Sequence, residues 1–376
     1  MTESASSAVT AHTGAAPPGD FSFRLRHHGR LPDVLGLALT NLLLKVVTLG
    51  LYHFWGKTRV RRYLWSQTEW DGERLVYTGT GRELFLGYLR AFFLIIVPIY
   101  AVFFAIGWFS ERMPLLTVAI GMLFWPLLLY LTGVALYSAW RYRLNRTVWR
   151  GIRFGLEGSP WRFGGFFLVQ TLLTFVTGGL YSPFMQCRVA GRVIGQARFG
   201  TERFAYEGRG DDLLAPFLRT VGLTLAIGLV GIVGLAVLMP VLLGFGTAPG
   251  GGGPQPWLLV LPALAGLAAV SSMVALWIAY QGTQLRYHVE HTRLGPLRFR
   301  LPFRWQEYVR LTLGNASLVV LTLGLGLPLT AVRTARFVAA RLGAAGTPDY
   351  AAIAQSQQQP GRAGEGLTQA LDMGSL

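Results

Sequence analysis

The chain has 376 residues, of which 52% are hydrophobic and only 14% are charged, and its formal net charge is +16. Soluble domains carry about 25% charged residues, so this composition indicates a membrane protein and excludes a water-soluble enzyme with one packed core. The one cysteine, Cys187, excludes an intramolecular disulfide.

Two polar tails are predicted to flank an apolar body. Residues 1–20 are rich in Ser, Thr, Ala, Gly and Pro and lack the features of a signal peptide, so we expect a disordered tail. Residues 343–376 are polar and poor in aromatic residues, which predicts a second tail without a fold of its own. Seven apolar segments lie between the tails: Leu35–Trp55, Ala91–Trp108, Pro114–Trp140, Gly164–Met185, Val221–Phe245, Trp257–Tyr280 and Leu311–Val332.

The basic residues argue against seven complete crossings. Cytoplasmic connections collect Lys and Arg, and here all basic residues except Lys45 and Arg112 lie in the tails, the longer connections or the segment ends beside them. This predicts two transmembrane hairpins, made by the second and third and by the fifth and sixth segments, with both termini cytoplasmic. The other three segments would enter or lie along the membrane from the cytoplasmic side, since each has a break, at Thr48–Gly50, Thr177–Gly179 and Thr322–Gly324. Seven kinked but complete spans are the alternative.

An internal repeat is the strongest signal in the sequence. At an offset of 129 residues, eight of the eighteen positions from 73 to 90 are identical, whereas unrelated sequences match at about one position in fifteen. A third copy follows at a further offset of 145 residues. We therefore expect repeat 1 over 21–140, repeat 2 over 141–285 and a partial repeat 3 over 286–342.

Each repeat is predicted to contain a short strand, the broken apolar segment and an Arg-bearing helix such as Lys57–Trp65. In the first two repeats a second strand and a transmembrane hairpin follow. The predicted strands are Phe21–Arg26, Arg74–Gly79, Gly151–Leu156, Arg203–Gly208 and Leu297–Leu301. The predicted fold class is an all-α polytopic membrane protein with small cytoplasmic β-strand elements, which pair between neighbouring units, and about two and a half copies of the repeat.

Three stretches carry a resemblance to a known family: TNLLLKVVTLGLYHFWGKTRVRRYLW, GERLVYTGTGRELFLGYL and the late GEGLTQALDMG. Together they resemble the YjgN family of bacterial inner-membrane proteins, a domain of unknown function, from about Phe21 to the C-terminus. The resemblance implies a multi-pass protein of the bacterial inner membrane and supplies no substrate, cofactor or catalytic residue. The aromatic run Tyr52–Trp55 is not repeated in the second and third copies.

Arg59, Arg188 and Arg333 recur at the same place in the three units and are the candidate site residues. Arg clusters beside a bilayer are expected to hold the protein against anionic headgroups, with about 1 kcal/mol from each basic group. A sharper hypothesis makes these three a shared contact for an anionic lipid or other anionic ligand. Nucleic-acid binding has only the net charge in its favour, so none is predicted.

The remaining polar groups are predicted to be structural. Glu83 and Asp212 are expected in salt bridges or helix caps, and the Gly-x-Gly stretches 79–81 and 208–210 in turns that lead into the hairpins. His288 and His291 lack a third metal ligand nearby. We therefore predict no enzyme, no catalytic residue, no cofactor and no metal.

Two functions stay open. The first is a small-molecule or lipid-handling transporter or channel, by analogy with other repeat-built membrane proteins. The second is a non-catalytic membrane scaffold or lipid-interacting envelope protein, favoured because the hairpin segments contain no Asp, Glu, Lys or His. The expected partners are anionic phospholipids, and a Gly-rich face at Gly222, Gly228, Gly231 and Gly234 would serve packing within the bundle or in a homo-oligomer.

Overall fold

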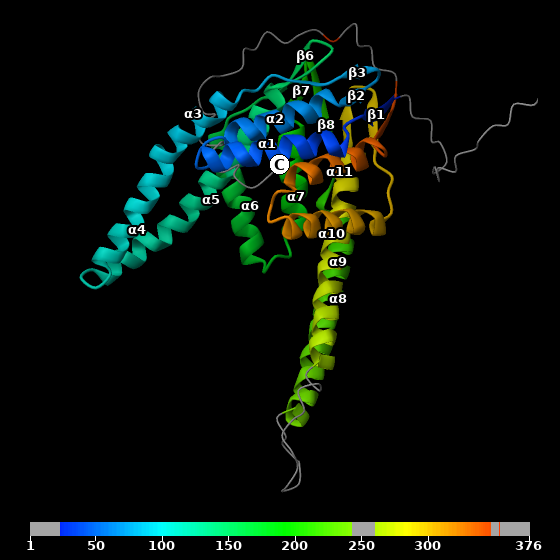
Figure 1. Cartoon of the computed structure of the whole chain (residues 1–376). Helices are drawn as coiled ribbons and strands as arrows, with labels where there is room; N and C mark the ends of the chain where they lie inside the picture. Colours follow the sequence, from blue (N-terminus) through cyan, green and yellow to red (C-terminus); the bar gives the residue numbers. More distant parts are fainter. Residues whose placement is uncertain (1–22, 243–259, 347–352, 354–376) are drawn as a thin grey trace, which may run out of the picture.

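The computed structural model describes residues 23–242, 260–346 and 353. The predicted tail 1–20 and nearly all of the predicted tail 343–376 lie outside these residues. The described chain is mostly helical, with its strands gathered at one side of the body and two long hairpins extending away from them (Figure 1). Among the residues that the structure describes, three helices are long and apolar enough to cross a membrane: Pro114–Asn145, Gly210–Val237 and Pro262–Glu290.

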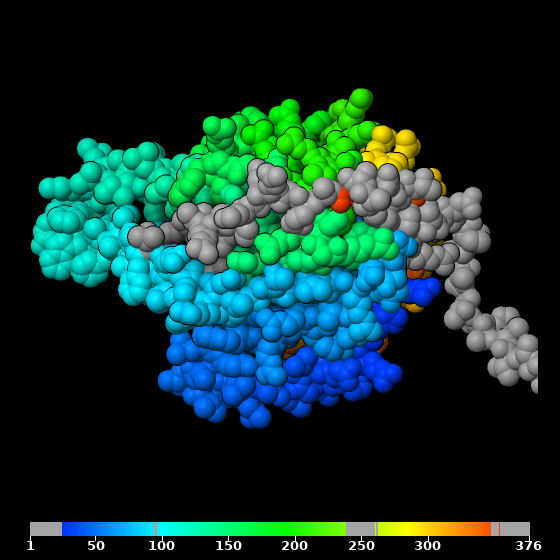
Figure 2. Space-filling model, turned by 90° about the horizontal axis from the view of Figure 1, so that it is seen from above, coloured from blue at the N-terminus to red at the C-terminus, as the bar shows by residue number. Residues whose placement is uncertain are grey.

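The first predicted transmembrane hairpin consists of a segmented rod and one long helix. The rod runs without interruption through α3 (Gly81–Ala91), the π-helical η1 (Phe92–Ile96) and α4 (Val97–Phe109). The π turn lies next to Pro98, where the helical hydrogen-bond ladder must be adjusted because proline has no N–H. The rod returns through α5 (Pro114–Asn145), and this α4–α5 hairpin stands out to one side when the molecule is seen from above (Figure 2).

The second predicted hairpin consists of α8 (Gly210–Leu242) and α9 (Val260–Glu290), which pack along each other. The Gly-rich face of α8 does not produce the close helix packing expected inside the bundle. A Cβ added at Gly222, Gly231 or Gly234 would have no described neighbour within 4 Å, and one at Gly228 would be 3.4 Å from Met273 Cε. Close packing occurs instead where α5 crosses α6, with Gly133 against Gly164.

The three remaining apolar segments each form a pair of helices joined by a tight turn, so the predicted breaks are confirmed. The pairs are α1 (Leu31–Val47) with α2 (His53–Ser66), α6 (Pro160–Val176) with α7 (Ser182–Ile194), and α10 (Trp305–Leu321) with α11 (Leu327–Ala339). A strand precedes each pair and another follows it. Both ends of every pair therefore lie at the sheet.

One threonine closes each of these turns. The Thr48 hydroxyl donates to Leu44 O at 2.6 Å, at the end of α1, and accepts from Tyr52 N at 2.9 Å, at the start of α2. Gly50 has a φ of 91° and its N–H donates to Lys45 O at 2.7 Å, which satisfies another terminal carbonyl. The same contacts recur in the turns that begin at Thr177 and Thr322. In such a turn the terminal backbone groups are hydrogen-bonded within the protein and need few hydrogen bonds from water.

The strands in the described part of the chain form one eleven-stranded antiparallel sheet. They are β1 (Phe23–His27), β2 (Thr68–Trp70), β3 (Glu73–Arg74), β4 (Val76–Tyr77), β5 (Thr147–Trp149), β6 (Ile152–Leu156), β7 (Ala197–Phe199), β8 (Glu202–Tyr206), β9 (Thr292–Leu294), β10 (Leu297–Arg300) and β11 (Gly343–Ala345). Their order is β3-β2-β1-β11-β10-β9-β8-β7-β6-β5-β4. Because β3 and β4 are separated in the chain by Leu75 alone, the strand order returns on itself as a closed ring.

The inside of this ring is a hydrophobic core to which β2 and β5 to β11 contribute. Its buried members are Trp149, Phe154, Phe199, Leu294, Leu297 and Ala344. Trp70 of β2 stacks on Trp149 of β5 with ring centroids 4.8 Å apart, next to the junction of β3 and β4. Aromatic contacts of this kind continue round to Phe204 and Phe299. The ring thus buries apolar surface that no single unit could cover.

The structure corrects two sequence predictions. The predicted pairing of strands is observed but is far more extensive than expected, and β2, β5, β7, β9 and β11 were not predicted because three residues are too few to show an alternating pattern. The predicted C-terminal tail is wrong at its start, since Gly343–Ala345 pairs with both β1 and β10, and Ile353 packs against the core of the ring. The all-α class is therefore incomplete.

Candidate functional site

The turns of the three helix pairs expose large apolar side chains. The exposed fractions are 94% for Leu49, 83% for Phe175 and 93% for Leu323. Leu49 and Leu323 also have positive φ angles, of 50° and 49°, a conformation that costs a non-glycine residue about 1–2 kcal/mol. Large exposed apolar patches mark surfaces that meet a partner or a lipid phase.

The candidate arginines lie on the second helix of each pair. Arg59 is exposed and its Nη1 donates to Tyr52 Oη at 3.0 Å. Arg188, also exposed, lies with its guanidinium carbon 5.6 Å from the centre of the Tyr181 ring. Both arginines are thus held along the helix by a tyrosine seven residues earlier, close to the turn.

Arg333 has a different environment. It is half-buried, and its Nη1 donates to Gly314 O on α10 at 3.2 Å. Within the described residues, no hydrogen bond joins Arg59, Arg188 and Arg333 to one another. The structure brings each one to its own helix pair, so a single pocket shared by the three stays a prediction.

A set of polar residues inside the helix pairs was not predicted from the sequence. Asn41 is buried and its Nδ2 donates to Gly56 O at 3.3 Å, which joins α1 to α2. Gln170 accepts from Tyr181 Oη at 2.8 Å, and Asn315 donates to Thr334 Oγ1 at 3.1 Å. The repeat offsets already align these three residues, and polar side chains are known to join helices within membranes.

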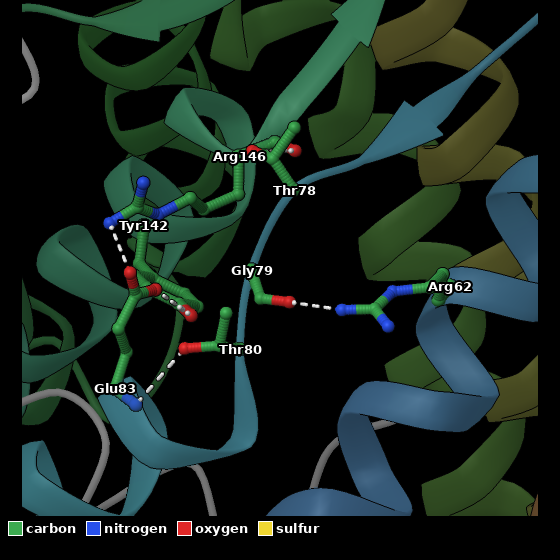
Figure 3. Close-up of polar contacts among 7 residues, drawn as sticks. All are labelled: Arg62, Thr78, Gly79, Thr80, Glu83, Tyr142 and Arg146. Atoms are coloured by element: carbon green, nitrogen blue, oxygen red, sulfur yellow. Dashed lines mark hydrogen bonds and ion pairs between the residues drawn. The ribbon is translucent and has the colours of Figure 1, made fainter.

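A cluster at the start of α3 joins the ring, the first helix pair and the first hairpin (Figure 3). Glu83 accepts from Arg146 Nη2 at 3.0 Å and from Tyr142 Oη at 3.2 Å. Tyr142 lies in the last turn of α5 and Arg146 directly follows that helix. The Thr80 hydroxyl accepts from Glu83 N at 3.3 Å and so caps α3. Arg62 of α2 donates to Gly79 O at 3.2 Å. The prediction of a salt bridge at Glu83 is confirmed, whereas 79–81 is not a turn: Thr80 is extended and Gly81 is already the first residue of α3.

Asp212 is the counterpart of Glu83 at the start of α8. It accepts a hydrogen bond from Tyr287 Oη of α9 at 2.5 Å, and the same hydroxyl accepts from Arg209 N at 2.6 Å. Asp212 and Glu83 thus each tie the first helix of a hairpin to the second. Their role in the described structure is to fix the hairpins at the ring.

The buried thiol of Cys187 belongs to the same junction. Tyr206 Oη lies 2.7 Å from His288 Nδ1 and also interacts with Cys187, which is 4% exposed. Burial raises the pKa of the Cys187 thiol, so it stays protonated and unreactive at neutral pH. His291 Nδ1 lies 2.8 Å from Tyr287 O. In the part of the chain that the structure describes, no three His, Cys, Asp or Glu side chains are grouped to hold a metal ion.

A family of bacterial proteins of unknown function, DUF898, matches residues 22–370. The chain belongs to this family. Among curated relatives, the inner membrane protein YjgN of Escherichia coli K12 is 29% identical over 132 residues, which cover 35% of this chain and 30% of that protein. YjgN of Salmonella typhimurium LT2 is 24% identical over 140 residues, 37% of this chain and 33% of that protein. No solved structure matches.

These comparisons confirm the resemblance to the YjgN family that the sequence motifs indicated. The aligned part spans about a third of each curated relative. Both relatives are named as inner-membrane proteins, and the described part of this chain has helices long and apolar enough to cross a membrane.

Proposed function

We propose that this protein is a non-catalytic, multi-pass protein of the bacterial inner membrane that binds anionic phospholipids, with its strand ring and both termini on the cytoplasmic side. One observation carries the proposal: three helix pairs begin and end at the same ring and expose apolar residues at their turns. Irregular backbone within a bilayer must have its polar groups satisfied internally. The threonine-closed turns meet that requirement.

The distribution of charge supports the proposed orientation. In the described α4–α5 turn the charged residues are Glu111 and Arg112, whereas the Arg-bearing helices α2, α7 and α11 lead back to the ring. Cytoplasmic surfaces collect Lys and Arg and face anionic lipid. An inward-facing ring places nearly all of the net positive charge on that side.

We also infer that the chain is built from the repeated units predicted from the sequence. The shared order of strand, helix, turn, helix and strand supports this, as do the matching contacts of Thr48, Thr177 and Thr322. A unit with unpaired strand edges is stabilised by its neighbours. The closed ring would be the product of that pairing.

A lipid-interacting envelope protein is favoured over a transporter or channel. The core of the ring consists of aromatic and aliphatic side chains, and the hairpin segments contain no Asp, Glu, Lys or His to conduct ions or protons. The open space beside Gly222, Gly231 and Gly234 supports a homo-oligomer formed through α8. A unitary conductance in planar bilayers containing the purified protein would favour the channel instead.

Lipid retention tests the proposal. The variant R59Q/R188Q/R333Q should lose most of its co-purifying phosphatidylglycerol and cardiolipin, because three contacts of about 1 kcal/mol each are removed. The matched control R26Q/R74Q/R300Q removes the same charge from exposed strand arginines and should retain these lipids. Equal lipid content in both variants, measured by mass spectrometry of lipid extracts, would contradict the proposed contacts.

A further inference from the structure

A cavity of about 420 Å³ opens beside the turn of the first helix pair. Its walls come from the end of α1, the turn, the start of α2 and one residue of α3. The lining residues are Lys45, Leu49, Gly50, Leu51, His53, Phe54 and Tyr88. The volume falls within the range of about 300–1,000 Å³ that is usual for small-ligand sites.

Lys45 is the only Asp, Glu, Lys or Arg residue in the seven apolar segments. Its side chain is partly buried and makes no hydrogen bond or ion pair with any residue that the structure describes. A cation in apolar surroundings is costly and needs a counter-charge or a route to the headgroups. The C-terminal end of α1 supplies a favourable partial negative charge for the Lys45 ammonium. That interaction does not require a cavity, so it does not explain the open space beside Lys45.

The other walls specify what kind of anion would fit. Leu49, Leu51 and Phe54 supply apolar surface, and Tyr88 supplies an aromatic ring with a hydroxyl. A free inorganic anion would gain little from these apolar walls. A phosphate that carries acyl chains would use both the cation and the apolar surface.

The equivalent positions in the other two helix pairs lack the cation. Thr174 and Val319 stand three residues before the turn threonines, as Lys45 does. Thr174 is engaged within its own pair, where its hydroxyl donates to Gln170 O at 2.9 Å. Of the three helix pairs, only the first therefore has a cation at this position beside its turn.

We propose that this cavity is a binding site for the phosphate of one anionic phospholipid, with Lys45 as the charged contact and the turn as the acyl-chain wall. The inference rests on the proposed function, since it requires the α1–α2 turn to lie in lipid. It names a distinct site, because Arg59 lies on the exposed side of α2 and does not line the cavity.

Calorimetric titration of the full-length protein in a non-ionic detergent tests the site, with short-chain dihexanoyl phosphatidylglycerol as the probe. The wild type should bind it saturably, and K45T should weaken binding by at least about tenfold, because a hydrogen bond to a charged group is lost. K45R should keep most of the affinity, which separates loss of charge from misfolding. T174V, at the matched place in the second pair, should bind as the wild type does.

Three results would overturn the assignment: equal binding by K45T, equal binding of dihexanoyl phosphatidylcholine, or equal binding of inorganic phosphate. The last would mean a simple anion site without a lipid wall. If R59Q/R188Q/R333Q loses anionic lipid while K45T binds as the wild type does, the cavity assignment alone fails. If neither substitution changes lipid binding, the proposed function fails as well.

Discussion

Replacing Gly81 by alanine should destabilise the junction between the first helix pair and the first hairpin. Gly81 is the first residue of α3, and a Cβ added there would lie 2.7 Å from the Trp55 indole and 2.8 Å from Trp55 Cα. The indole could rotate away, but the Cα can move only if α2 shifts. Overpacking of this kind costs about 1–3 kcal/mol. The gain in helix propensity is at most about 1 kcal/mol, so the net effect is a loss of stability.

The free energy of unfolding can be measured by titration with sodium dodecyl sulfate in mixed micelles, followed by circular dichroism. The control is Gly36→Ala in the middle of α1, where an added Cβ would meet no atom within 4 Å. This change should stabilise the protein by up to about 1 kcal/mol. Gly210→Ala should resemble Gly81→Ala, since its Cβ would lie 2.7 Å from Phe184 Cα. If Gly81→Ala is as stable as Gly36→Ala, the close approach of α2 and α3 is wrong.

Three further predictions concern His27, Asn41 and Cys187. Burial and the nearby Arg336 lower the pKa of His27, so the unfolded chain binds more protons than the folded one. The free energy of unfolding should therefore fall as the pH drops below about 6.5. H27N should weaken this pH dependence, as measured by chemical unfolding at several pH values. N41A should cost about 1 kcal/mol in the same assay, because the hydrogen bond to Gly56 O is lost; no cost would mean that the bond does not stabilise the pair. Cys187 should react with a thiol reagent only after denaturation, and rapid labelling of the folded protein would contradict its burial.

The sequence predicted the helices better than the sheet. The broken segments were visible because Thr-x-Gly interrupts an apolar run, and the structure places each turn at that tripeptide. The strand ring was not visible, since five of its strands have three residues each and its closure depends on Leu75 joining β3 to β4. Pairing between distant strands leaves no local pattern.

The candidate site was predicted in part. Glu83 was expected in a salt bridge or a helix cap, and the structure pairs it with Arg146. Asn41 and the cavity beside Lys45 were missed for different reasons. Asn41 is a single amide in an apolar helix, and a cavity is formed by elements that only the tertiary structure brings together.

The central claim is that each helix pair returns to the side from which it came. In a Cys187→Ala background, single cysteines at Ser159, before α6, and at Thr201, after α7, can be labelled with a membrane-impermeant thiol reagent. Ser110→Cys, in the α4–α5 turn, reports the opposite side. The account predicts that positions 159 and 201 label only in inverted vesicles and position 110 only in intact cells. Labelling of 159 and 201 from opposite sides would contradict it, because the α6–α7 pair would then cross the membrane.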